Sequence, residues 1–138
     1  MKEVKYIPLD LVKADKNPNI IWKVKDVSQD KRGNVLYRVV AAEDNDAFIY
    51  LYEHQIASIH LTPEILEKNG WYKEPYENVT WYKYRTDKSN LYICKDSFNK
   101  KDWLVCVDLD KHYIANINYV HQLQHLLFGL GLPMDLKV

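Results

Sequence analysis

Both ends of a short helix are encoded in the stretch Leu61-Thr62-Pro63-Glu64-Ile65-Leu66-Glu67-Lys68-Asn69-Gly70-Trp71. Thr62 can cap the first turn, because its hydroxyl oxygen can accept a hydrogen bond from a free backbone N–H. Pro63 suits the first helical position, where no N–H is needed and φ is already set. Gly70 can adopt the left-handed conformation that ends a helix. The sequence therefore predicts a helix over about residues 63–69.

This helix divides two β-rich parts of the chain. Its apolar side chains are predicted to lie in the core, and they are Leu61, Ile65, Leu66 and Trp71. The chain before it is predicted to form one small β unit, and the chain after it a second. The expected domain boundaries are therefore residues 1–60 and 61–138.

The first part contains three runs of β-branched and aromatic residues, which are typical of strands. These runs are 20–27, 35–41 and 47–52, with polar turns between them. Residues 53–59 can hold a short strand or a 3₁₀ turn. Residues 6–12 are apolar enough for an edge segment or a single turn, and 13–19 are expected to be a loop. Short antiparallel strands with tight turns favour an SH3-like barrel, with an ordinary meander as the alternative.

The second part is predicted to be an antiparallel meander closed by an amphipathic helix. Strands are expected at 79–85, 91–95 and 103–109, with a possible fourth at 112–115. Residues 71–76 are expected to be an aromatic connector. Residues 118–129 show the apolar spacing of a helix, with Asn118 as its predicted N-cap. The fold class that follows is α+β.

Composition limits the possible functions. The chain has 138 residues, 19 basic and 19 acidic side chains, and a formal net charge of zero. A nucleic-acid binder usually needs a basic excess, so the charge balance argues against one. No run approaches the roughly 20 apolar residues that cross a bilayer, and the first residues lack the apolar core of a signal peptide. We therefore expect no membrane partner and a cytoplasmic location.

The two cysteines, Cys94 and Cys106, fit neither a disulfide scaffold nor a zinc site, because close cysteine pairs are missing. They are expected to be small, half-buried strand residues. If residues 99 and 100 form the centre of the turn, Cys94 faces Val105. A shift of one residue would place the two cysteines opposite each other, and the sequence leaves both registers open.

Aromatic residues are unusually frequent, with 11 Tyr, 4 Trp and 3 Phe. Within the predicted strand 79–85, alternation places Trp81 on one face and Tyr82 and Tyr84 on the other. Exposed Tyr and Trp side chains bury a large area at low entropic cost, so these three and the adjacent Arg85 are candidate binding residues. The alternative, cross-strand packing within the sheet, is favoured.

The predicted C-terminal helix carries a second candidate set, His121, Gln122, Gln124 and His125. His121 and His125 have the spacing of two zinc ligands on one helix face. Gln122 stands where the glutamate of a His-Glu-x-x-His protease would act, and glutamine is no general base. Third ligands would have to come from His112, Asp108 or Asp110. A polar helix face without metal is the favoured interpretation, and no cofactor is predicted.

Two blocks resemble segments of a group of small uncharacterised proteins from Bacteroidetes bacteria and their phages and prophages, including crAss-like phages. They are the stretch 61–71 and Ile117-Asn118-Tyr119-Val120-His121-Gln122-Leu123-Gln124-His125-Leu126. The resemblance covers about residues 20–130 in order. It implies a phage or prophage accessory role in an intracellular setting, and it supplies no activity or site residues.

The sequence thus favours a non-enzymatic protein that binds a host or phage protein or assembles with itself. One alternative is a small-ligand binder, such as a protein that sequesters a nucleotide signal on its aromatic strands. A second is a metal-dependent hydrolase that uses His121 and His125. The phosphate-binding Gly-rich loops and the Gly-x-Ser-x-Gly turn are missing from the sequence, which disfavours an enzyme.

Overall fold

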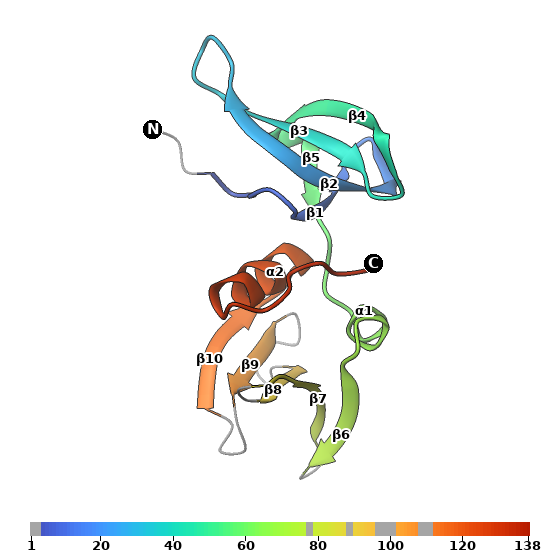
Figure 1. The fold of residues 1–138 in the computed structure, drawn as a ribbon, viewed down its shortest axis with the longest axis vertical. Helices are drawn as coiled ribbons and strands as arrows, with labels where there is room; N and C mark the ends of the chain where they lie inside the picture. Colours follow the sequence, from blue (N-terminus) through green and yellow to red (C-terminus); the bar gives the residue numbers. More distant parts are fainter. Residues whose placement is uncertain (1–3, 77–78, 88–89, 96–101, 108–111) are drawn as a thin grey trace. The chain divides into compact units, whose positions relative to one another are not determined.

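The computed structural model describes residues 4–76, 79–87, 90–95, 102–107 and 112–138. The described residues form two antiparallel sheets of five strands each, together with two α-helices (Figure 1). This mainly β architecture agrees with the predicted α+β class.

The chain divides into two compact units, and each unit contains one sheet. The first comprises the residues up to His60 together with Tyr119–Leu136. The second comprises Leu61–Asn118 with Lys137–Val138. This division differs from the expected boundaries of 1–60 and 61–138, because side chains of the C-terminal helix bond residues 9–11 of the N-terminal segment.

The first sheet has the strand order β4-β3-β2-β1-β5. A 3₁₀ turn, η1 (Glu53–Gln55), connects its last two strands in the sequence. The strands are β1 (Leu11–Ala14), β2 (Asn17–Gln29), β3 (Val35–Ala41), β4 (Asp44–Tyr52) and β5 (Ile56–Ser58). The loop predicted at 13–19 is wrong, because β1 and β2 leave only two residues between them.

Alternating side chains of these strands form the core of the first unit. Trp22 and Val24 are buried on one face of β2, as their spacing predicts. Tyr37 is fully buried on β3, and its hydroxyl oxygen accepts hydrogen bonds from the backbone N–H groups of Lys5 and Tyr6. These bonds fix the segment before β1 against the sheet, with the rings of Tyr6 and Tyr37 edge to face at 5.6 Å.

The second sheet has the strand order β10-β9-β8-β7-β6, which is the predicted meander. Its strands are β6 (Tyr72–Tyr76), β7 (Val79–Arg85), β8 (Asn90–Lys95), β9 (Trp103–Val107) and β10 (His112–Ile117). The connector expected at 71–76 is instead the edge strand β6. Proline lacks a backbone donor, and β6 tolerates Pro75 because, among the described strands, it pairs with β7 alone and is an edge strand.

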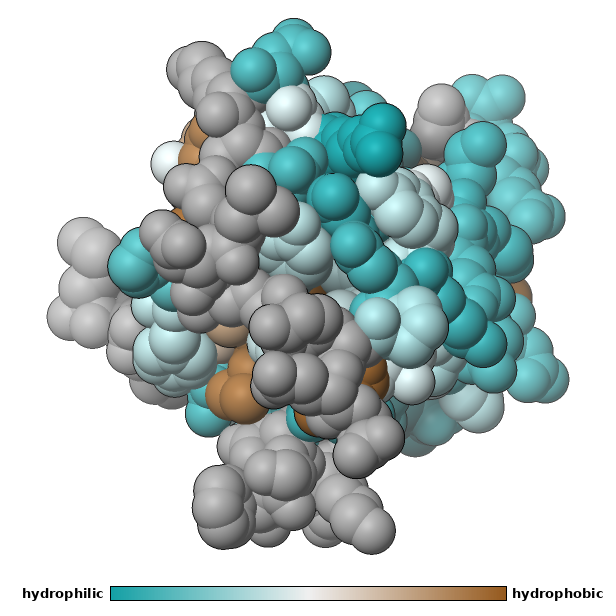
Figure 2. Space-filling view, turned by 90° about the horizontal axis from the view of Figure 1, so that it is seen from below, coloured by the Kyte–Doolittle hydropathy of each residue, from teal (hydrophilic) through white to brown (hydrophobic). Residues whose placement is uncertain are grey.

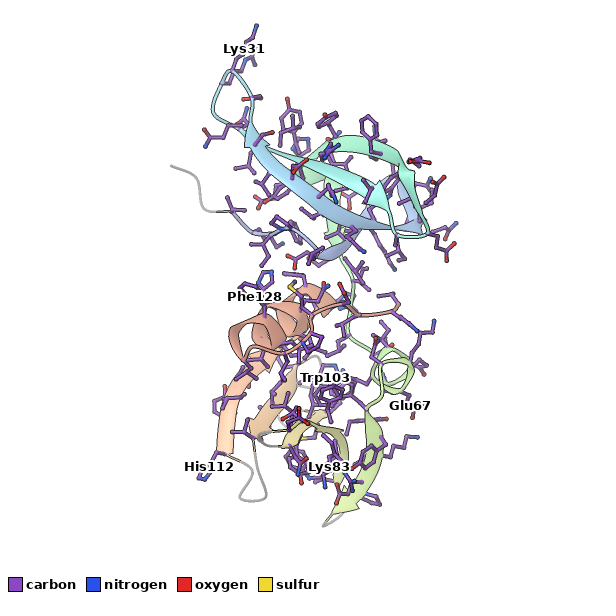
Figure 3. The ribbon with its side chains drawn as sticks, viewed as in Figure 1. Lys31, Glu67, Lys83, Trp103, His112 and Phe128 are labelled. Carbon is purple, nitrogen blue, oxygen red and sulfur yellow. The ribbon has the colours of Figure 1, made fainter. Side chains whose placement is uncertain are left out.

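The helix α1 (Pro63–Lys68) begins and ends where the sequence predicts. The Thr62 hydroxyl oxygen accepts a hydrogen bond from the N–H of Ile65 at 3.3 Å. Gly70 follows the helix with a φ of 88°. All four predicted core residues of this stretch are buried, and the indole N–H of Trp103 donates to the carbonyl of Leu61. The Trp103 side chain lies inside the second unit (Figure 3).

The register of β8 and β9 differs from both alternatives considered for the cysteines. Cys94 pairs with Leu104, and Tyr92 pairs with Cys106. The cysteines are therefore neither opposite each other nor displaced by a single residue. Both are buried free thiols. The centre of this turn lies outside the described residues.

The helix α2 (Val120–Gly129) belongs to the first unit. Its N-cap residue is Tyr119 rather than the predicted Asn118, and the N–H of Tyr119 donates to the Gln122 side chain at 3.1 Å. Val120, Leu123 and Leu127 are buried, as their helical spacing predicts.

Gln124 is the fully buried polar residue of α2. Its side-chain oxygen accepts a hydrogen bond from the N–H of Leu11 at 2.9 Å. Its side-chain nitrogen donates to the carbonyls of Leu9 at 2.9 Å and Met134 at 3.1 Å. One amide thus joins α2 to the start of β1 and to the C-terminal segment.

Gln124→Leu is expected to lower the free energy of unfolding by about 2–4 kcal/mol, because it removes the partner of the half-buried Leu9 carbonyl and of the buried backbone groups of Leu11 and Met134. Urea denaturation measures the change. Gln122→Leu is the matched control, since the Gln122 side chain is only half-buried and bonds the adjacent turn. An equal loss of stability in both variants would contradict the role given to Gln124.

Candidate functional site

The aromatic residues predicted as a binding patch lie on β7 and pack within the second unit. Tyr82 is buried and meets Trp103 edge to face, with ring centroids 6.1 Å apart. Trp81 is half-buried and meets Tyr92 at 6.4 Å. The alternation that places Trp81 and Tyr82 on opposite faces is confirmed, and so is the favoured interpretation of cross-strand packing.

The remaining members of this set are less enclosed. Tyr84 is half-buried and stacks on Trp71 at 5.2 Å. Arg85 is exposed, and its Nε donates to the hydroxyl of Tyr72 at 2.9 Å. In the view of Figure 2, the residues of highest hydropathy appear only as small separate areas among the coloured atoms. Tyr82 is buried and Trp81 and Tyr84 are half-buried, so the four predicted residues of β7 do not form one exposed aromatic surface.

The polar residues predicted on α2 mostly serve the first unit itself. Gln124 holds backbone groups, and Gln122 caps its own helix. His121 is buried, with its ring 4.9 Å from that of Tyr6. Burial is the main reason that the pKa of His121 is lowered to about 4, and the neighbouring His125 and Lys5 add to it. His121 is therefore neutral at pH 7.

His125 forms a close pair with Asp10, whose side chain is fully buried. The His125 Nε2 atom lies 2.7 Å from the Asp10 Oδ2 atom, which also accepts a hydrogen bond from the N–H of Ile7 at 2.9 Å. Burial raises the pKa of Asp10, although the bonds from Ile7 and His125 work against it. The pair holds α2 to the turn around Leu9, which has a φ of 79°.

A metal centre on α2 finds no support in the described residues. Among them, no three His, Cys, Asp or Glu side chains are grouped so that they could hold a metal ion. Of the third ligands considered, His112 lies at the start of β10. Asp108 and Asp110 fall outside the residues that the structure describes.

The structure places a pocket elsewhere in the first unit, between the β2–β3 loop and η1. Its volume is about 480 Å³. The loop supplies one wall and the end of β4 with η1 supplies the other. The residues that line it are Asp30, Arg32, Asn34, Val35, Tyr52, Glu53 and His54. Lys31 lies at the outer tip of the same loop (Figure 3).

The Asp30 side chain lines this pocket and is held in place by hydrogen bonds. Its Oδ1 accepts hydrogen bonds from the backbone N–H groups of Arg32 at 2.8 Å and Asn34 at 2.9 Å. Its Oδ2 accepts one from the hydroxyl of Tyr52 at 3.1 Å. The bond from the Asn34 N–H is the main reason that the pKa of Asp30 is lowered, and Asp30 in turn raises the pKa of Tyr52. At neutral pH Asp30 is therefore ionised and Tyr52 protonated.

The rim of the pocket is free to meet a ligand. Arg32, Glu53 and His54 are exposed, and their side chains form no hydrogen bond or ion pair with any residue that the structure describes. The ring of His54 lies parallel to that of Tyr52, with centroids 5.9 Å apart. The rim thus offers a cation, an anion and an aromatic surface.

A row of aromatic side chains leads along β4 to this pocket. Phe48 and Tyr50 alternate with Ile49 and Leu51, and they lie on the same face of the strand as Tyr52. The rings of Phe48 and Tyr50 meet edge to face at 6.0 Å. The guanidinium of Arg38 lies over Phe48 at 5.9 Å and is paired with Asp26.

Sequence reasoning identified β4 as a strand but missed its outer face. The signal was available, because 47–52 is apolar at every position, whereas a half-buried antiparallel strand normally alternates with polar residues. A small sheet can bury only one of these two faces in its own core. The density of aromatic residues in 71–84 drew the prediction to the second sheet instead.

Comparisons with known proteins found no family for this chain. No protein-family model matches the chain, and no match appears among curated proteins or among solved structures. Within the described residues, no helix is both long enough and apolar enough to span a bilayer.

The stability of the first unit is expected to fall as the pH drops from 7 to 5. The unfolded state takes up a proton at His121 near the ordinary pKa of 6.5, whereas the folded state does so at about 4. The unfolded state therefore binds more protons in this window, which costs about 2 kcal/mol at pH 5. Urea denaturation at both pH values measures the loss.

His121→Phe is expected to remove this loss while keeping a ring against Tyr6. Asp10 acts in the opposite sense, because its raised pKa gives stability that is lost as the pH rises above 3.8. Comparison of the variant with the unaltered protein cancels that contribution. His54→Phe, at an exposed position, is the matched control and should retain the loss. The same pH dependence in His121→Phe and in the unaltered protein would refute the assignment.

Proposed function

We propose that this protein is a non-enzymatic accessory protein of phage or prophage type that acts as a protein-binding or self-assembling module. In this proposal the first unit holds an extended segment of a host or phage protein in the pocket between the β2–β3 loop and η1. The phage or prophage origin and the cytoplasmic setting rest on the resemblance of the two sequence blocks.

We further infer that the first unit is an SH3-like barrel. The strand order β4-β3-β2-β1-β5 supports this, as does the 3₁₀ turn between β4 and β5. The long, bulged strand β2 pairs with both β1 and β3, which lets one strand serve two halves of a curled sheet. Small barrels of this kind leave loops at one end to form a recognition surface.

The observation that carries the proposal is that the pocket combines side chains held by hydrogen bonds with exposed side chains at its rim. Asp30 and Tyr52 keep the shape of the pocket through their hydrogen bond, while Arg32, Glu53 and His54 are available. Preorganised aromatic and charged groups of this sort are typical of protein recognition, since little entropy is lost when they bind. Asp30 has both carboxylate oxygens engaged, which disfavours a role as general base.

A nucleotide is the second candidate ligand. The pocket suits a nucleotide better than the aromatic strands of the second sheet do. The parallel rings of Tyr52 and His54 offer a surface on which a base can stack, and Arg32 offers a cation for phosphate. Tyr82 and Trp81 have their rings packed in the sheet, so they offer less. A metal-dependent hydrolase at His121 and His125 is the third candidate, and it lacks a third ligand among the described residues.

Selection from a displayed peptide library is expected to yield peptides whose affinity depends on the pocket. Arg32→Ala and His54→Ala should each weaken a selected peptide by about tenfold, the loss of roughly 1.4 kcal/mol that one interfacial contact contributes. Fluorescence anisotropy measures the affinities. Both positions are exposed, so the variants should keep the stability of the unaltered protein.

Tyr113→Ala, an exposed aromatic position on β10 of the second sheet, is the matched control and should bind the peptide normally. Titration calorimetry with nucleoside mono- and diphosphates separates the second candidate. If nucleotides bind, if Arg32→Ala abolishes their binding, and if no peptide is selected, the nucleotide candidate would replace the protein-binding proposal. Peptide affinities that both pocket variants leave unchanged would refute the pocket as the site.

A further inference from the structure

The end of α1 contains an asparagine followed by a glycine, Asn69-Gly70, and the sequence has no second pair of this kind. Asn69 is the C-cap of the helix, and Gly70 follows it with a φ of 88°. The N–H of Gly70 donates to the carbonyl of Glu67 at 3.3 Å, and that of Trp71 donates to the carbonyl of Leu66 at 3.1 Å. Glycine is the favoured residue at this type of helix end, so the fold of the stretch accounts for its presence.

The Asn69 side chain is engaged by backbone groups on both sides. Its nitrogen donates to the carbonyls of Ile65 and Lys137, both at 2.7 Å. Its oxygen accepts a hydrogen bond from the N–H of Lys137, also at 2.7 Å. One amide therefore binds both backbone polar groups of Lys137 and holds this residue beside α1, within the second unit.

An asparagine followed by glycine is prone to deamidation, because glycine has no side chain to hinder attack by its backbone nitrogen. In this reaction the Gly70 nitrogen forms a bond to the side-chain carbon of Asn69, and ammonia leaves with the displaced proton. Water then opens the cyclic imide to aspartate or isoaspartate. The attack requires both groups to turn toward each other. Their hydrogen bonds to Glu67, Ile65 and Lys137 oppose that rotation.

We propose that Asn69 is a deamidation site protected by its hydrogen bonds to Lys137, and that its conversion to aspartate releases the segment at Lys137. The inference goes beyond the proposed function and does not depend on the pocket. Because ammonia is lost to the solvent, the change is not reversed. The released fraction of the protein therefore grows with the age of the molecules.

The chemistry of aspartate at this position argues for the release. A carboxylate has no N–H to donate, so the carbonyls of Ile65 and Lys137 lose the partner that Asn69 supplies. The carboxylate also places a negative charge beside these carbonyl oxygens, at the C-terminal end of a helix, where the helix dipole disfavours it. Of the three hydrogen bonds of the side chain, only the one from the Lys137 N–H suits an aspartate.

Peptide mapping by mass spectrometry, after incubation at neutral pH for increasing times, tests the protection. Lys137→Pro removes the N–H that bonds the Asn69 oxygen and should speed deamidation about fivefold, as expected for one lost hydrogen bond. Lys137→Ala is the matched control, because it keeps that N–H and alters only an exposed side chain. It should react at the rate of the unaltered protein. Equal rates in Lys137→Pro and the unaltered protein would overturn the proposal, as would equal acceleration in both variants.

Ile93→Val separates local release from unfolding of the second unit. Ile93 is fully buried on β8, and loss of its methylene destabilises the core by about as much as one lost hydrogen bond. This variant leaves every bond of Asn69 in place and should deamidate at the rate of the unaltered protein. If it reacts as fast as Lys137→Pro, unfolding controls the reaction and the proposal fails.

Asn69→Asp tests the release itself. Exchange of the Lys137 backbone amide in deuterated water, followed by NMR, should become at least about tenfold faster than in the unaltered protein. The amides of β8 in the same unit should keep their exchange rates. Unchanged exchange at Lys137 would overturn the release, because aspartate would then hold the segment as well as asparagine does. Equal acceleration in β8 would also overturn it, because the whole unit would then have loosened.

Discussion

The first unit depends on one buried amide. Gln124 satisfies an N–H and two carbonyls that lie far apart in the sequence, at Leu11, Leu9 and Met134. Leaving a buried backbone group without a partner destabilises the fold by more than a typical hydrogen bond stabilises it. These groups therefore need the Gln124 side chain or an equivalent one. Apolar packing alone would allow α2 to slide along β1. The three bonds fix its position, and the Asp10–His125 contact adds a fourth polar attachment nearby.

This constraint explains which features of the fold could be predicted. The helix α1 is readable because its signals are local: the cap, the proline and the terminal glycine lie within one short stretch. The apolar spacing of α2 is equally readable, and its buried side chains follow it. Which sheet α2 joins is a long-range matter, because Val120, Leu123 and Leu127 would suit any apolar surface. Gln124 bonds residues 9 and 11 of the first unit, and its neighbours in the sequence do not indicate these partners.

The roles of the candidate functional residues also depend on long-range contacts that the sequence does not reveal. The polar residues of α2 were candidates because His121 and His125 have the spacing of two zinc ligands, and the structure uses the polar side chains mainly for internal contacts. Tyr82 and Tyr84 lie in the stretch richest in aromatic residues, yet their rings pack against Trp103 and Trp71 within the second unit. On the edge strand β4, Phe48 and Tyr50 have a neighbour on one side only. Position within the sheet, which the sequence does not state, decides whether an aromatic side chain is core or surface.

The strand β4 ends at the pocket that we propose as the binding site. Its outer row ends at Tyr52, which is held by Asp30 and lies parallel to His54 at the pocket rim. Asp30 accepts hydrogen bonds with both carboxylate oxygens, so the loop and the end of the strand are joined before a ligand arrives. The exposed rim residues Arg32, Glu53 and His54 are thereby presented on a preorganised surface, which lowers the entropy that binding costs.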